Sequence, residues 1–183
     1  MLEPGNPPDS AALDAVLRAA LKGQYHAALA MLRSAIELCP EDLWSGSGPG
    51  PGAPFWRVAY HTLFYAHLYM QRDEASFEPW AQHRAGAQDL DEVPTPPVEP
   101  YSKAELLSYW GVCDAMVGGA IDTLDVLQPD TGFRWHNPQR SKVEQHVSAI
   151  RHIQHHATQL SGRVRAASGM GADWVGAVAH GSS

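Results

Sequence analysis

Residues 143–164 read VEQHVSAIRHIQHHATQLSGRV, and they decide the fold because they have the spacing of an amphipathic helix. A stripe off the centre of its apolar face carries His152 and His156 together with Gln159. We therefore expect a long final helix over about Gln139–Ala167, with histidines beside its apolar face. That face consists of residues that return every three or four positions: Val143, Val147, Ile150, Ile153, Ala157, Leu160 and Val164.

The first long helix is expected near the start of the chain, over Ala11–Leu38. Leucine, valine and isoleucine recur there at helical spacing, and Ser10 offers an N-cap. Gly23 is a point at which this run can divide into a short helix and a longer one. Pro40 ends the run, because proline has no amide hydrogen to continue a helix.

Two more helices are expected in the middle of the chain. The run Phe55–Gln71 is apolar nearly all round, which predicts a buried helix. Ser102 and Glu105 form a capping-box pattern, which predicts a helix that continues to about Leu127. The long stretch Arg72–Pro100 between them is expected to be a loop, and such loops are often functional. Since no strand pattern or internal repeat occurs, the predicted fold class is all-α, a four-helix bundle.

The domain organisation follows from these segments. We expect one helical domain over residues 10–168, since the chain has 183 residues and most of them fall in the four helices. A flexible tail at 1–9 precedes it, and a tail at 169–183 follows. Within this second tail, Trp174 and Val175 are expected to dock on the bundle.

Charge and composition exclude several classes of protein. The net charge is −7 and no cluster of lysine or arginine occurs, which argues against nucleic acid as a partner. The most apolar stretch, Phe55–Met70, is too short and too polar for a membrane span. Met1 is not followed by a secretory signal pattern, and Cys39 and Cys113 are too few for a disulfide framework. We therefore expect a cytoplasmic protein with reduced thiols.

The histidines are the residues with the clearest chemical potential. His152 and His156 are at i and i+4, so both imidazoles can reach one metal ion. Periodicity alone favours the alternative that they lie on a solvated polar face. His61 lies among apolar residues and is expected to be buried, where its ring nitrogens need partners. Either it bonds a backbone carbonyl, or it completes a three-histidine metal site with open positions. His67 lies about 240° round the helix from His61 and cannot face the same ion.

Other catalytic patterns fail at particular residues. A zincin motif needs glutamate directly after its first histidine, where Ile153 stands instead. A di-iron bundle needs Glu-x-x-His pairs, and Glu144 is too far from His152 to form one. No nucleophile elbow, P-loop or dinucleotide fingerprint occurs. Cys113 has no neighbour in sequence that would lower its pKa, so it is a poor candidate nucleophile.

The string His152-Ile-Gln-His-His156-Ala-Thr-Gln159 resembles the N-H-x-x-H-H-x-G-Q signature of the DinB/YfiT-like superfamily. The segment Phe55–His61 is similar to the stretch that carries the first metal ligand of that family. The resemblance covers about residues 20–165. Ala157-Thr158 depart from the Arg-Gly that often precedes the glutamine, which affects local helix packing. Carried over residue by residue, the resemblance implies the metal ligands His61, His152 and His156.

The resemblance also implies an up-down-down-up bundle, often a homodimer, that holds one divalent metal ion of zinc, nickel or iron type. His155 and Gln159 would then be neighbours that orient the ligands. Characterised enzymes of the family are largely metal-dependent transferases and isomerases that use a low-molecular-weight thiol. We therefore expect an enzyme that acts with a small thiol or metal-activated water. The alternatives are a metal-binding bundle without catalysis and a ligand-binding bundle in which the histidines are incidental.

Overall fold

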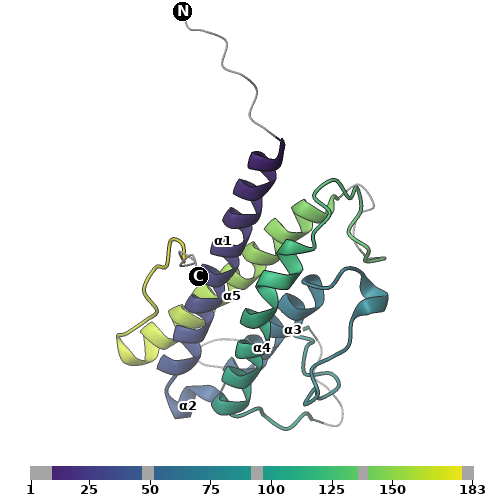
Figure 1. The fold of residues 1–183 in the computed structure, drawn as a ribbon. Helices are drawn as coiled ribbons and strands as arrows, with labels where there is room; N and C mark the ends of the chain where they lie inside the picture. Colours follow the sequence, from purple (N-terminus) through teal and green to yellow (C-terminus); the bar gives the residue numbers. More distant parts are fainter. Residues whose placement is uncertain (1–9, 47–51, 92–96, 136–139, 179–183) are drawn as a thin grey trace, which may run out of the picture.

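The computed structural model describes residues 10–46, 52–91, 97–135 and 140–178, and within these ranges the chain forms helices and loops without a strand. The expected all-α fold is confirmed, while the predicted tail at 1–9 lies outside the described residues. Figure 1 shows the long helices packed side by side. The elements are α1 (Ser10–Leu38), α2 (Glu41–Trp44), α3 (Phe55–Tyr69), the 3-10 turn η1 (Glu74–Ser76), α4 (Lys103–Asp122) and α5 (Lys142–Ser168).

Helix α5 runs parallel to α1. Tyr25, in the first half of α1, shares a hydrogen bond with His146 near the start of α5. Further along both helices, the amide of Gln154 contacts the sulfur of Met31. Because the two contacts occur in the same order along α1 and α5, the helices point the same way.

Helices α3 and α4 run in the opposite direction. Gln145, near the start of α5, donates to the carbonyl of Tyr69 at the end of α3. Arg18, near the start of α1, donates to the carbonyl of Ile121 at the end of α4. Since α1 and α3 each pack against both α4 and α5, the bundle has the expected up-down-down-up arrangement (Figure 1).

One predicted helix limit is wrong, and the possible division of the first helix at Gly23 does not occur. Helix α1 passes through Gly23 without a break, because the residues on either side of this glycine, Leu21 and Tyr25, are buried in the bundle. Helix α4 ends at Asp122 rather than near residue 127. Arg18 binds carbonyls at this point, including that of Leu124, and so fixes the end of α4 from another helix.

The start of α4 agrees with the prediction. The Ser102 hydroxyl accepts from the Glu105 amide, and the Glu105 carboxylate accepts from the Ser102 amide. Arg84 donates to the same carboxylate at 2.6 Å. The capping box therefore also anchors the long loop between α3 and α4.

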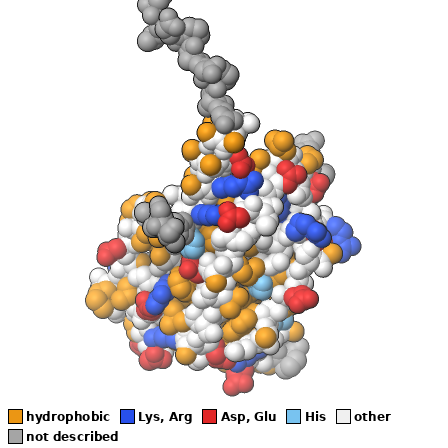
Figure 2. Space-filling view, viewed as in Figure 1, with side chains coloured by type: hydrophobic (Ala, Val, Ile, Leu, Met, Phe, Trp, Pro, Cys, Tyr) orange, Lys and Arg blue, Asp and Glu red, His pale blue; other side chains and the backbone are white. Residues whose placement is uncertain are grey.

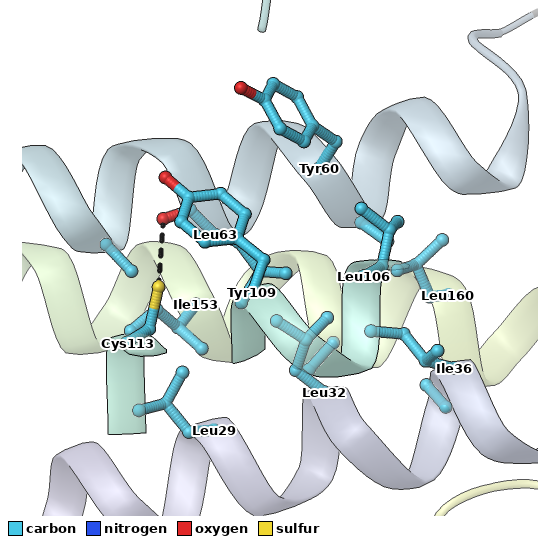
Figure 3. Packing of buried hydrophobic residues seen from close by; sticks show 14 of the residues in the cluster. Leu29, Leu32, Ile36, Tyr60, Leu63, Leu106, Tyr109, Cys113, Ile153 and Leu160 are labelled. Atoms are coloured by element: carbon cyan, nitrogen blue, oxygen red, sulfur yellow. Dashed lines mark hydrogen bonds between the residues drawn. The ribbon is translucent and has the colours of Figure 1, made fainter. Parts of the chain in front are cut away.

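The core lies between the four long helices, where apolar side chains from each of them interdigitate (Figure 3). Cys113 of α4 lies in this core and donates to the Leu63 carbonyl. Burial raises the pKa of the Cys113 thiol, so the thiol stays protonated and is a poor nucleophile. Cys39 is also a free, buried thiol, and burial raises its pKa to about 11.

Stacked aromatic rings hold the loop between α3 and α4 against the bundle. Trp80 stacks on Tyr109 with a centroid distance of 4.5 Å, and Tyr101 stacks on Tyr60 at the same distance. The Tyr101 hydroxyl donates to the Gln82 carbonyl within the loop. These contacts hold the described parts of the loop against α3 and α4.

The segment after α5 docks only in part. Val175 packs against the core, and the carbonyl of Gly176 accepts from Gln24 of α1. Trp174, which was expected to dock as well, is 75% exposed. The backbone around Ala172 is held at Ser161 instead, and this leaves the neighbouring indole ring outside the bundle.

The surface is chemically mixed. Figure 2 shows acidic and basic side chains interspersed with apolar ones on the face in view. The first turns of α1 extend beyond the other helices (Figure 1). The side chains of Leu13 and Val16 in these turns are exposed. Across the described residues, no helix combines the length and the apolar character that crossing a bilayer requires.

A buried histidine away from the candidate site gives a prediction on stability. His146 is 1% exposed. Burial, together with the charge of Lys142, lowers its pKa to about 4. Because its folded pKa lies below the unfolded value of about 6.5, the unfolded chain binds the extra proton between these values. The contribution of neutral His146 to the free energy of unfolding is constant above pH 6.5 and decreases as the pH falls toward 4. The decrease amounts to about 1.4 kcal/mol per unit of pKa shift.

We expect His146→Gln to flatten this dependence, since glutamine can bond Tyr25 and does not titrate. The measurement is urea unfolding of both proteins at several values between pH 7 and pH 4. A variant that loses stability in parallel with the wild type over this range would show that His146 does not contribute.

Candidate metal centre

The first imidazole of the candidate site is fixed by the loop that follows α3. His61 lies in the middle of α3, and its Nδ1–H donates to the Gln88 carbonyl at 2.6 Å. This bond sets the tautomer, because the nitrogen that donates to a carbonyl must carry the proton. The lone pair of Nε2 is therefore directed away from the loop. The carbonyl alternative predicted for His61 is thus present, and it leaves the second ring nitrogen for another partner.

Two histidines of α5 face His61 across the bundle. His61 Nε2 and His152 Nε2 are 3.1 Å apart. His156 lies one turn further along α5, and its ring centroid is 4.9 Å from that of His61. One ligand atom from each of the three side chains lies within 4.8 Å of the others. The structure therefore brings together the three residues expected as metal ligands.

Gln159 supports the third histidine. The Nδ1–H of His156 donates to Gln159 Oε1 at 2.9 Å, which leaves the other ring nitrogen free to bind. His155 is exposed, and its ring packs beside that of His156 with centroids 4.9 Å apart. Of the two neighbours expected to orient the ligands, Gln159 thus makes the hydrogen bond, whereas His155 makes a ring contact.

All three imidazoles are neutral at pH 7. Burial lowers the pKa of His61 to about 4 and that of His152 to about 3, and it also lowers the pKa of His156. For His152, the nearby imidazoles add to the effect, because a second positive charge beside the first is unfavourable. The neutral imidazole is the form that binds metal ions.

The donor set fits a divalent ion. Ligand nitrogens about 2.0–2.1 Å from a tetrahedral ion lie about 3.3 Å from one another. The 3.1 Å between His61 Nε2 and His152 Nε2 is close to this spacing, which suits two ligands of one ion. His152 Nδ1 is buried and has no hydrogen-bond partner among the described residues. His61 and His156 therefore have the oriented geometry usual for metal ligands, and His152 lacks that support.

His67 is excluded from this cluster, as its position round the helix predicted. Its Nδ1 shares a hydrogen bond with the Tyr109 hydroxyl at 3.1 Å in the core between α3 and α4. Phe77 packs against the same ring edge-on. His67 is therefore a core residue that cannot reach the ion position without rotation of α3.

The alternative that His152 and His156 lie on a solvated polar face of α5 is wrong. His156 is 8% exposed, whereas Val147, assigned to the apolar face, is 45% exposed. The reason is that α5 packs against both α1 and α3, so it buries two faces rather than one. The histidines lie on the face toward α3.

Two cavities open beside His61. One, of about 690 Å³, includes His152 and has mainly aromatic walls, among them Tyr65 of α3 and Trp135 of the connector before α5. The other, of about 520 Å³, includes Asp89 and is more polar. Residues of the long loop after α3 line the first cavity together with Trp135 of the connector. Phe133 is buried and packs against the Trp135 ring.

Sequence reasoning missed two groups of this site. Tyr65 lines both cavities and its ring centroid lies 4.7 Å from that of His61. Its position four residues after His61 on a helix was a usable signal, since i and i+4 share a face. The Gln88 carbonyl had no signal, because a backbone acceptor can belong to any residue type.

A family model described as the DinB superfamily matches residues 24–160. This range contains His61, His152, His156 and Gln159, and it covers most of the bundle. No curated protein and no solved structure shows significant similarity to the chain. The family model matches well over half of the sequence, and the helix order and direction agree with the bundle expected for that family. The chain therefore belongs to the DinB superfamily.

Proposed function

We propose that this protein binds one divalent metal ion of zinc, nickel or iron type through His61, His152 and His156. The observation that carries the proposal is the convergence of three neutral imidazoles, with 3.1 Å between the facing nitrogens of His61 and His152. Three protein ligands are enough to hold such an ion, and this number is typical of catalytic sites.

We further propose that the protein is a metal-dependent enzyme rather than a bundle in which the ion has only a structural role. Two cavities that share His61 support this proposal, since a structural site is closed off by its protein ligands. An ion held by neutral ligands keeps its positive charge and lowers the pKa of a thiol or water bound beside it. Burial raises the pKa of the Tyr65 phenol at the same place, so this group stays protonated and can donate a hydrogen bond.

The attacking group is proposed to come from outside the chain. Both cysteines are buried, and burial raises the pKa of each thiol. A low-molecular-weight thiol is therefore the proposed cosubstrate, in a reaction of transferase or isomerase type, with water as the alternative. The chain would contribute the oriented imidazoles and walls that exclude solvent from the bound molecule.

The test is a titration of cobalt-loaded protein with small cellular thiols. We expect binding heat and a new thiolate-to-metal charge-transfer band with at least one of them, and neither signal with protein treated with a chelator. The Gln159→Ala variant, which keeps all three imidazoles, should show the same band at higher thiol or metal concentration. Metal-loaded protein that gives no band with any thiol would exclude the thiol reaction and favour metal-activated water.

A further inference from the structure

The cavity shared by His61 and His152 has walls of unusual composition. Four of its apolar and aromatic residues lie on α3, at i, i+1, i+4 and i+5, one comes from the loop after α3, and one comes from the connector between α4 and α5. Among the described residues that line it, Glu74 alone carries a formal charge. The apolar and aromatic members are Phe64, Tyr65, Leu68 and Tyr69 of α3, Phe77 of the loop and Trp135 of the connector.

The aromatic walls are held in place by contacts with one another. Phe64 meets Phe77 edge-to-face at 5.2 Å and meets Tyr65 in the same manner at 5.4 Å. On the opposite side, Phe133 packs edge-on against Tyr69 at 5.6 Å and lies 5.4 Å from Trp135. Edge-to-face pairs fix the orientation of the rings of Phe64, Tyr65, Tyr69 and Phe77, so these walls are preformed for a rigid ligand.

The charge of the cavity is balanced. The two oxygens of Glu74 each accept a hydrogen bond from Arg134 at 3.0 Å. A carboxylate paired in this bidentate manner has little remaining attraction for a cation. An aromatic cage attracts an ammonium ion through its ring faces, and an unpaired carboxylate adds to that attraction. This cavity has the rings without the free charge, which favours a neutral ligand.

We propose that this cavity binds a neutral, planar aromatic molecule, with its polar atom directed toward His61 and His152. A volume of about 690 Å³ accommodates one or two fused rings together with a cosubstrate or water. The inference rests on the proposed function in one respect: the polar atom of the ligand meets the metal ion. The aromatic selectivity itself depends only on the walls.

The experiment uses the neutral fluorescent probe N-phenyl-1-naphthylamine with metal-free and zinc-loaded protein. Fluorescence should rise in both forms as the probe enters the cavity. Naphthalen-2-ol should displace the probe, and phenyltrimethylammonium should do so at least about 10-fold less well. Phe77→Ala and Trp135→Ala should each weaken binding by about 10-fold through loss of ring contact. The matched control is Trp174→Ala, since Trp174 is an exposed tryptophan at a different cavity, between α1 and α5.

The outcomes separate the two proposals. Zinc binding, measured by calorimetry, without probe binding overturns this inference and leaves the proposed function standing. Probe binding without zinc binding overturns the proposed function and leaves the aromatic selectivity of the cavity standing. Equal displacement by naphthalen-2-ol and the aromatic cation would overturn the choice of a neutral ligand. Unchanged binding in both Phe77→Ala and Trp135→Ala would place the probe elsewhere. Trp135 is half exposed, so its variant remains informative if Phe77→Ala fails to fold.

Discussion

Replacement of His61, His152 or His156 by alanine is expected to weaken zinc binding by more than about 100-fold, which exceeds the usual 10–100-fold effect of losing a supporting group. Each of these side chains supplies one of the converging nitrogens. Two imidazoles leave the ion with an incomplete protein ligand set, and α5 alone can offer only two. Calorimetric titration with zinc, on protein without a histidine tag, measures the effect.

Three control variants make this prediction specific. Gln159→Ala should lose about 10-fold in affinity, because it leaves His156 as a ligand but removes its hydrogen-bond acceptor. His155→Ala, at an exposed position, should bind as the wild type does. His67→Gln should also bind normally, since it can keep the contact with Tyr109. If His67→Gln lost as much affinity as His61→Ala, the orientation of α3 described above would be wrong.

Lys142→Met is expected to lower the free energy of unfolding by about 3 kcal/mol, the largest effect on stability expected of a polar residue here. Lys142 is 3% exposed. Its ammonium donates to the carbonyls of Gln71, Arg72 and Thr131 at 2.8–3.0 Å. Burial lowers the pKa of Lys142 to about 8, so the charged form still predominates at pH 7. Methionine preserves much of the volume but leaves these carbonyls without their donor.

The matched control for this lysine is on the surface. Lys22 pairs with Asp122, a residue whose side chain is 61% exposed, and Lys22→Met should change the free energy of unfolding by less than about 1 kcal/mol. Urea unfolding of both variants is the measurement. If both variants lost a similarly small free energy of unfolding, water would have replaced Lys142 as the hydrogen-bond donor to the three carbonyls. A secondary expectation is weaker probe binding in Lys142→Met, because Thr131 belongs to the connector that carries Trp135.

Much of the fold could be predicted because it depends on local patterns. The spacing of apolar residues identified the four long helices, and Ser102 with Glu105 marked the start of α4. The errors arose where a distant contact decides the outcome. The end of α4 depends on Arg18 from another helix, and the continuity of α1 at Gly23 depends on packing around it. Neither contact can be predicted from the residues that neighbour Asp122 or Gly23 in the sequence.

The candidate site shows the same division. The i, i+4 spacing of His152 and His156 placed them on one face, and the apolar surroundings of His61 predicted burial. Periodicity could not show that α5 buries a second face against α3, and so it favoured a solvated position for His156. The resemblance to a family decided between these alternatives. The Gln88 carbonyl could be found only in the structure, since the loop path depends on ring stacking between residues that are distant in sequence, such as Trp80 and Tyr109.

The most direct test of the metal centre is elemental analysis of tag-free protein before and after dialysis against zinc, together with the His61→Ala variant. The account predicts about one divalent ion per wild-type chain, removable by a strong chelator, and far less than one per chain for the variant. Wild-type protein that contains no metal and acquires none on dialysis would contradict the account. The same would follow from equal metal content in wild type and variant.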